Sequence, residues 1–344
     1  MVSSREGDSM TEVFRWGILG TGGIAKDFAD GLAELPDARL HAVAARKRAS
    51  AQAFAQSRAD KGQHPQVCDD YAAVIQHPEV DVVYIATTHH NHVALARQAI
   101  AAGKAVLVEK PVGLHGDEVA TMVAEAQASG VFLMEAMWTR FMPAIQALQH
   151  ALAEDVLGPV RLVQADFGID LPHIDAQHRM LDPALGGGAL WDLGIYPLTF
   201  SRLIFGCDPH HIQSIMIPAP ETGVDELSAI LARFGDGGVA QLMCGFRLRV
   251  PHQARIYGPK GRIVVDDFFH PQAFTIEPHE GEARTENYPF TGPGYQFEAA
   301  EVQRCLRAGL QESSVCPLQE TLALIRIMDQ LVQQWGIIYP RGAL

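Results

Sequence analysis

Short apolar runs alternate with helical segments through the first 134 residues, and this alternation limits the fold more than any other feature of the chain. Each of the first four runs is followed by a segment of helical pattern. Strands and helices that alternate in this way form a parallel sheet with crossover helices. The sequence therefore predicts an N-terminal α/β domain of Rossmann type with a doubly wound parallel sheet. The five runs are residues 14–19, 40–45, 80–86, 106–108 and 131–134.

The pattern changes after about residue 150. Residues 227–234 and 239–248 are strand-like runs joined by a glycine-rich hairpin signal at 235–238. Further strands are expected at 159–168, 255–258 and 262–266, and helices at about 187–205 and 317–335. These elements predict a C-terminal α+β domain with a large open, mostly antiparallel sheet. The expected divisions are a disordered extension at 1–12, the Rossmann domain at 13–136 and the β-sheet domain at 137–344.

Composition and charge exclude several classes of protein. The 344 residues carry a net charge of −13 and only one short basic run, at 46–48, so nucleic acid and anionic membranes are poor partners. No apolar stretch approaches the roughly 20 residues of a membrane span, and residues 1–11 lack the apolar core of a signal peptide. The five cysteines form no CxxC pair, which indicates reduced thiols and a cytoplasmic location.

A glycine-rich loop follows the first apolar run directly. It reads G-T-G-G-I-A and matches the pattern G-x-G-x-x-A in its expected context, between a strand and a helix. The first glycine makes the tight turn, the second allows a pyrophosphate to approach, and the small last residue lets helix and strand pack. The helix N-terminus offers free N–H groups to phosphates. The predicted cofactor-binding residues here are Gly20, Gly22, Gly23, Ile24 and Ala25.

The end of the second apolar run indicates which dinucleotide binds. An NAD enzyme normally places an acidic residue there to bind the ribose 2′-hydroxyl. Residues 38–59 contain no acidic residue, and the run ends in Arg46, Lys47 and Arg48. A guanidinium suits a 2′-phosphate, and a neighbouring cation adds charge. We therefore predict NADP as the cofactor, bound by Arg46 and Lys47.

Two segments carry side chains suited to acid–base chemistry. Lys110 lies in Glu109-Lys110-Pro111, directly after the fourth run, where parallel sheets bind ligands. Asp192 and Tyr196 are four residues apart and would share one face of a helix, although Gly194 and Pro197 make a kink there possible. A lysine, an aspartate and a tyrosine together form a workable proton relay. Lys110, Asp192 and Tyr196 are the predicted catalytic residues.

These motifs occur in the order of a known family. The G-x-G-x-x-A loop, the Glu-Lys-Pro run and the glycine-rich segment 186–196 together resemble the glucose–fructose oxidoreductase/inositol dehydrogenase/MocA (Gfo/Idh/MocA) family. Residues 132–141 are similar to the branch that contains dimeric dihydrodiol dehydrogenase and NADP-dependent D-xylose dehydrogenase. The resemblance covers nearly the whole chain after about Val13; it is strong in the first 200 residues and weaker in the antiparallel strands predicted after them.

The resemblance implies roles for particular residues. Lys110 corresponds to the family's active-site lysine, Tyr196 to its acid–base tyrosine and Asp192 to the acidic residue between them. The loop with Thr87 and His89 would pass close to the nicotinamide half of the cofactor, and it departs from the Thr-Pro of many members by reading Thr-Thr. Glu109 belongs to the cofactor site. Trp138 and Phe167 would line the substrate pocket, with Arg179 as a further candidate. The outer face of the C-terminal sheet would form a homodimer.

The expected reaction is hydride transfer between NADP and a neutral polyhydroxylated ring. We expect an aldose such as D-xylose, oxidised at C1 to a lactone. A phosphorylated sugar is not expected, because the chain lacks a second basic cluster. The alternatives are a cyclic trans-dihydrodiol as substrate and a non-catalytic NADP-binding regulator on the same fold.

Two other signals are set aside or left open. His89, His90 and His92 lack acidic or cysteine partners at ligand spacing, so no metal site is predicted. Arg140 and Arg179 could each contact a ligand or make an ion pair at the domain junction.

Overall fold

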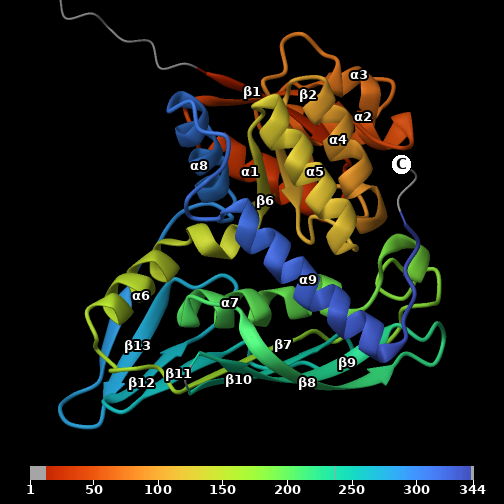
Figure 1. Cartoon of the computed structure of the whole chain (residues 1–344). Coiled ribbons are helices and arrows are strands. Elements are labelled where there is room, and N and C mark those ends of the chain that lie inside the picture. The colour runs from red at the N-terminus through yellow and green to blue at the C-terminus, as the bar shows by residue number, and fades with distance from the viewer. Residues whose placement is uncertain (1–12, 236, 342–344) are drawn as a thin grey trace, which may run out of the picture.

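The structure is a computed structural model that describes residues 13–235 and 237–341. Within this part of the chain, the first sheet has six parallel strands in the order β3-β2-β1-β4-β5-β6 (Figure 1). They are β1 (Phe14–Leu19), β2 (Ala38–Ala44), β3 (Gln66–Val67), β4 (Val82–Ile85), β5 (Ala105–Glu109) and β6 (Leu133–Ala136). Strands β4 and β5 are buried along their whole length, as parallel strands between helical layers are. The predicted doubly wound sheet is confirmed.

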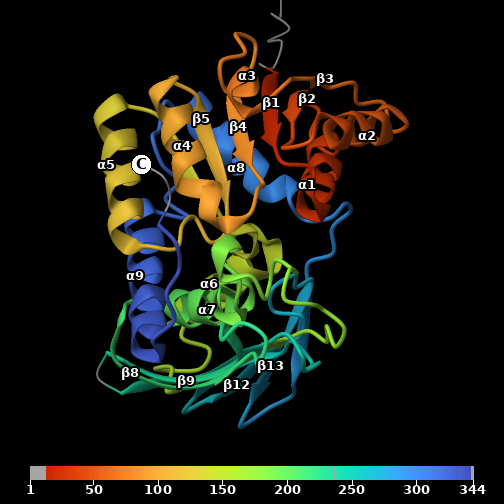
Figure 2. The ribbon, with the colours of Figure 1, turned by 90° about the vertical axis from the view of Figure 1, so that its right-hand side faces the viewer.

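Helices cover both faces of this sheet. α1 (Gly23–Ala33) packs against α8 (Gln296–Arg307) on one face, and α4 (His92–Ala101) packs against α5 (Gly116–Ser129) on the other (Figure 2). In α1 the buried residues Ala25, Phe28, Ala29 and Leu32 recur at helical spacing, and they form the stripe that faces the sheet. The other helical elements of this half are α2 (Arg48–Ala59), α3 (Tyr71–Ile75) and the 3-10 turn η1 (His89–Asn91).

A second sheet has eight strands among the described residues. Their order is β14-β13-β12-β11-β7-β10-β9-β8, and β7 and β10 are its one parallel pair. They are β7 (Leu162–Gly168), β8 (Pro209–Pro218), β9 (Asp225–Phe234), β10 (Gly238–Gly245), β11 (Ala254–Gly258), β12 (Gly261–Val265), β13 (Ala273–Pro278) and β14 (Arg284–Asn287). Phe234 pairs with Gly238 across the predicted hairpin. The open, mostly antiparallel sheet is confirmed.

The buried face of the second sheet carries the helix that leads to the site. A single π-helical turn, η4 (Leu190–Gly194), runs directly into α7 (Ile195–Phe205), which packs against β7 and β10. The irregularity expected near Gly194 is therefore a π turn and not a sharp break in the helix. The remaining elements of this region are η2 (Trp138–Phe141), α6 (Pro143–Ala153) and η3 (Pro183–Leu185).

The chain returns to the first sheet after it completes the second. α8 packs so closely on α1 that a Cβ at Gly31 would lie 2.8 Å from the backbone nitrogen of Gln296. α9 (Leu318–Trp335) packs against α5 and β6 of the first part and against α7 of the second (Figure 1). Because both C-terminal helices contact the first part, a division of the chain at residue 136 stays a prediction.

Two further expectations concern the termini and membranes. The predicted disordered extension at residues 1–12 lies outside the described residues. In the part of the chain that the structure describes, no helix has the length and apolar character needed to cross a membrane.

Candidate active site

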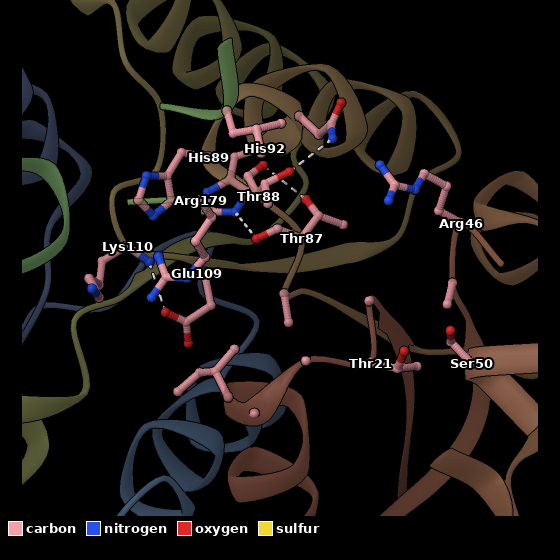
Figure 3. Close-up of a pocket in the computed structure, with 18 of the residues that line it drawn as sticks. Thr21, Arg46, Ser50, Thr87, Thr88, His89, His92, Glu109, Lys110 and Arg179 are labelled. Carbon is pink, nitrogen blue, oxygen red and sulfur yellow. Dashed lines mark hydrogen bonds between the residues drawn. The ribbon is translucent and has the colours of Figure 1, made fainter. Parts of the chain in front are cut away.

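A pocket of about 700 Å³ opens at the carboxyl ends of β1, β2, β4 and β5. Arg46, Ser50 and Thr21 lie at one end, and His89, Lys110 and Arg179 lie at the other (Figure 3). The second half of the chain contributes Arg179, Leu185, Asp192 and Tyr196, so the pocket lies where the two halves meet. The full set is Gly20, Thr21, Gly22, Gly23, Ile24, Ala45, Arg46, Lys47, Ser50, Tyr71, Ala86, Thr87, Thr88, His89, Asn91, His92, Glu109, Lys110, Arg179, Leu185, Asp192 and Tyr196.

The glycine loop has the shape that a pyrophosphate requires. Gly20 has a φ of +105°, and a Cβ there would lie 2.3 Å from the carbonyl oxygen of Ala86, so only glycine fits. A Cβ at Gly22 or Gly23 would meet nothing within 4 Å, because both face the open pocket. Gly22 precedes α1 and no side chain caps this helix, so its N–H groups remain available to phosphate. Ala25 is buried against the sheet and does not line the pocket.

The basic end of the pocket matches the sequence prediction in position. Arg46 and Lys47 line the pocket at the end of β2, and Arg46 makes no ion pair with any described residue. Arg48, in contrast, pairs with Asp69 and does not line the pocket. Ser50 and Tyr71 lie at the same end, and the sequence analysis did not select them. A serine three residues after Lys47 was a usable signal, whereas Tyr71 comes from a distant helix.

The three predicted acid–base residues converge at the other end. Lys110 Nζ lies 3.1 Å from Asp192 Oδ1, donates to the Asp192 carbonyl oxygen at 2.7 Å, and lies 5.0 Å from the centre of the Tyr196 ring. The cis peptide between Lys110 and Pro111 belongs to the turn that presents the lysine. Arg179 donates to the second oxygen of Asp192 at 2.9 Å. The carboxylate thus joins two cations at the junction of the two halves.

Burial and charge act in opposite directions on these groups. Burial alone would raise the pKa of Asp192, but the Lys110 and Arg179 cations outweigh it and hold that pKa well below its ordinary value. Burial alone would lower the pKa of Lys110, but Asp192 raises it overall. Burial raises the pKa of Tyr196 to about 12, and the Lys110 cation opposes part of this rise. At neutral pH the set is therefore a cation, a carboxylate and a neutral phenol.

Two histidines connect the loops around this end. His89 Nδ1 lies 2.9 Å from the carbonyl oxygen of Gly186, and His89 Nε2 lies 3.9 Å from Asp192 Oδ1. His92 lies between the carbonyl oxygens of Pro111, at 2.7 Å, and Thr87, at 3.1 Å. Burial lowers the pKa of His89 to about 3 and that of His92 to about 4, so both are neutral at pH 7. A neutral imidazole has one N–H, so His92 donates to one of the two carbonyl oxygens, and its ring packs between the Thr87 loop and the Lys110 turn, a position that the sequence did not indicate.

Glu109 is positioned from within the sheet. The hydroxyl of Tyr84, on β4, donates to Glu109 Oε1 at 2.5 Å, and the backbone N–H of Lys110 donates to Oε2 at 3.1 Å. Burial raises the pKa of Glu109 to about 7. Tyr84 was not selected from the sequence, because it lies within an ordinary buried apolar run.

The predicted substrate residues divide into two groups. Arg179 lines the pocket, whereas Trp138 and Phe167 do not. Trp138 donates to the Tyr196 hydroxyl at 3.1 Å, and the Phe167 ring packs edge-on against the Tyr196 ring at 5.1 Å. Both lie behind Tyr196, and their contact with a substrate stays a prediction. Arg140, which was left open, makes an ion pair with Glu320 at 2.6 Å.

A Rossmann sheet, a phosphate-binding glycine loop and a buried Lys–Asp–Tyr set beside it define the class, a dinucleotide-dependent oxidoreductase. Family comparisons agree with this class. Residues 14–137 match the oxidoreductase family with an NAD-binding Rossmann fold, and residues 145–264 match the GFO/IDH/MocA C-terminal domain. The chain belongs to the Gfo/Idh/MocA oxidoreductase family, as its motifs predicted. It is a dehydrogenase that acts on CH–OH groups.

Curated relatives and solved structures extend this result. The chain is 38% identical to a trans-1,2-dihydrobenzene-1,2-diol dehydrogenase of Mus musculus, over 95% of this chain and 98% of that protein. It is 36% identical to the Homo sapiens enzyme of the same name, with the same coverage. Among solved structures, an aldose-aldose oxidoreductase from Caulobacter crescentus has a TM-score of 0.84 at 23% identity, over 94% of this chain and 98% of that one. This last likeness shows the fold alone.

Proposed function

We propose that the enzyme uses NADP in preference to NAD. Three observations support this. At the basic end of the pocket, where the ribose phosphate would bind and which we call the ribose end, Arg46 has no ion-pair partner among the described residues, and Lys47 lies beside it. The acidic residues that line the pocket, Glu109 and Asp192, lie at the other end. A 3-ketoreductase from Actinomadura kijaniata has NADP bound, and its fold is similar, with a TM-score of 0.82 at 24% identity over 94% of this chain and 98% of that one. The residues present therefore fit a 2′-phosphate.

The chemical step follows from the Lys110–Asp192–Tyr196 set. A bound nicotinamide supplies the acceptor for the hydride that leaves the substrate carbinol carbon. Tyr196, as phenolate, takes the hydroxyl proton while the carbon becomes a carbonyl. Lys110 stabilises that phenolate, and Asp192 fixes the ammonium group in place. In the reverse direction the neutral Tyr196 donates its proton to the carbonyl oxygen. The observation that carries this proposal is the position of Lys110 Nζ between the Asp192 carboxylate and the Tyr196 ring.

The substrate we propose is a neutral six-membered ring with adjacent hydroxyls. We call the end of the pocket with Lys110, Asp192 and Tyr196 the chemical end. The cations that line the pocket are either at the ribose end or paired with Asp192, so none is free to bind a substrate phosphate at the chemical end. Two members of this class are candidates. The full-length likeness to proteins named trans-1,2-dihydrobenzene-1,2-diol dehydrogenase favours a cyclic trans-dihydrodiol. The convergence of Lys110, Arg179 and Tyr196 on one side of the pocket also suits C1 oxidation of an aldose such as D-xylose.

One assay tests the cofactor and the substrate together. NADPH formation by the purified protein would be measured with pentoses, hexoses, their phosphates and a trans-dihydrodiol, and repeated with NAD⁺. We expect turnover with NADP⁺ and with at least one neutral ring. Turnover confined to sugar phosphates would refute the argument from charge, and equal efficiency with NAD⁺ would refute the cofactor proposal. A comparison of kcat/KM between the sugar and the dihydrodiol identifies the better substrate.

We further propose a cytoplasmic homodimer. The outward face of the second sheet exposes large apolar side chains from three adjacent strands, and a second copy of this face would cover them. They are Ile215, Ile217, Leu231 and Val239. Sedimentation should give twice the mass of one chain, and Leu231→Glu should give the monomer. The five cysteines are all free, which supports a reducing compartment.

A further inference from the structure

Trp138 makes a specific polar contact with the proposed acid–base residue. Its indole N–H donates to the Tyr196 hydroxyl oxygen at 3.1 Å, and both residues are at least nine-tenths buried. Among the described residues this is the one hydrogen bond to the hydroxyl, since Lys110 contacts the face of the ring. The contact joins η2 to α7 through Trp138 and Tyr196, which are 58 positions apart in the sequence. The family resemblance predicts Trp138 as a lining residue of the substrate pocket and does not indicate a contact with Tyr196.

The chemistry of an indole determines what this bond does. An indole nitrogen is a donor only, so the Tyr196 oxygen must accept and cannot direct its own proton toward Trp138. Because Tyr196 lines the pocket, that proton is left to point toward a ligand there. A donor to the phenol oxygen also favours the ionised form, and the contact opposes the effect of burial on the Tyr196 pKa.

The indole is fixed in place by its neighbours. Tyr295 stacks on it with ring centres 4.3 Å apart and planes 10° apart, and His270 stacks on it at 5.2 Å. Gly294 has a φ of +98°, and a Cβ there would lie 3.1 Å from Trp138 Cζ3 and 3.2 Å from His270 Nε2. These ring contacts and the burial of Trp138 restrict rotation of the indole away from Tyr196. The segment that precedes α8 therefore holds the orientation of a residue on the far side of the site.

We propose that Trp138 is a positioning residue for Tyr196, whose donor-only N–H points the Tyr196 hydroxyl at the substrate and stabilises the phenolate that takes the substrate proton. This inference rests on the proposed role of Tyr196. It assigns to Trp138 a part in proton transfer that acts through Tyr196, whether or not the indole also contacts the substrate. The charged and titratable groups that face Tyr196 are Lys110, Glu109, Asp192 and Tyr295, and a change at Trp138 leaves all of them in place.

Trp138→Phe in the full-length protein tests the proposal, because phenylalanine keeps an aromatic ring for stacking and removes the N–H. We expect kcat for oxidation to fall about tenfold to hundredfold, the fold-change that corresponds to a hydrogen bond to a charged group. The ascending limb of the pH profile of kcat for oxidation, which reports the ionisation of Tyr196, should move to higher pH. The Kd of NADP⁺, measured by fluorescence titration, should not change.

Trp335→Phe is the matched control. Trp335 also donates its indole N–H to a hydroxyl, that of Ser214 at 2.9 Å, but it lies at the end of α9 and away from the pocket. This variant should keep the wild-type kcat and pH profile. If Trp138→Phe does not fold, β-(3-benzothienyl)alanine at position 138 keeps the two-ring shape with sulfur in place of the N–H and should give the same losses.

Tyr196→Phe separates this inference from the proposed function. Near-normal turnover of Tyr196→Phe would refute the role of Tyr196 itself. If Tyr196→Phe is inactive while the Trp138 variants keep the wild-type kcat and pH profile, the function stands and the positioning role of Trp138 is refuted. In the Tyr196→Phe background, Trp138→Phe should cause no further loss, because the two residues act through one oxygen.

Discussion

The two ends of the pocket are built in different ways. At the ribose end, Arg46, Lys47 and Ser50 lie within five consecutive residues and are all exposed. At the chemical end, the side chains of Lys110 and Asp192 are about nine-tenths buried and come from positions 82 residues apart. Exposed cations can bind a phosphate without help from the rest of the fold. Buried charges are costly unless they are paired, so the chemical end needs partners from both halves of the chain.

The largest effect is expected at the chemical end. Lys110→Met removes the cation beside the Tyr196 ring and leaves the phenolate without its nearest positive charge. We expect kcat to fall by roughly 10²–10⁴-fold, while NADP⁺ affinity in a fluorescence titration changes far less. Lys104→Met is the control, since Lys104 bonds carbonyl oxygens at the opposite end of the sheet. Near-normal turnover of Lys110→Met would show that the buried set is only structural.

A smaller effect is expected at the ribose end. Arg46→Ala should weaken NADP⁺ binding by about 1.5–3 kcal/mol, the range for a charge-assisted hydrogen bond, and it should leave NAD⁺ binding and the saturated kcat unchanged. The matched control is Arg48→Ala, because Arg48 already pairs with Asp69. Titration of both dinucleotides against the three proteins measures these differences. If the two variants lose NADP⁺ affinity equally, the contrast drawn between the neighbouring arginines is wrong.

A further effect, on stability, concerns the support beneath the chemical end. The buried carboxylate of Asp225 accepts from the backbone N–H of Leu190 at 2.6 Å and from the Ser228 hydroxyl at 3.2 Å, so it holds the π turn that carries Asp192. Burial raises the pKa of Asp225 to about 7. A carboxyl whose pKa is raised on folding stabilises the fold most below its unfolded pKa, and this contribution is lost as the pH rises through the folded value.

Asp225→Asn removes this titration. The free energy of unfolding of the wild type should fall as the pH rises from about 4 to 7, and that of the variant should not show this fall. The difference, variant minus wild type, should therefore increase by about 1.4 kcal/mol for each pH unit in this range. Urea unfolding of both proteins at pH 5 and pH 7 measures the change. An equal difference at the two pH values would mean that Asp225 ionises in the folded protein without cost.

Two strands that the sequence missed share a physical cause. β3 has two residues, and β14 reads Arg-Thr-Glu-Asn without an apolar side chain, so neither carries a strand signal of its own. Both are edge strands, and they form because a neighbouring strand offers them hydrogen-bond partners. β8, at the other edge of the second sheet, and β13, beside β14, were also missed, although both contain apolar residues. The other strands were predicted because burial on one or both faces requires an apolar or alternating pattern.

By itself the sequence determined the features that depend on neighbouring residues. The glycine loop, the basic turn after β2 and the Glu-Lys-Pro turn each lie within a few positions, and their chemistry and their order along the chain were enough to predict the family. The tertiary structure decided which distant groups meet. It pairs Lys110 with Asp192, it makes Trp138 a donor to the Tyr196 hydroxyl, and it brings Tyr295 onto Trp138. Such contacts depend on how two sheets and the returning C-terminal helices pack, and no local pattern of residues encodes that packing.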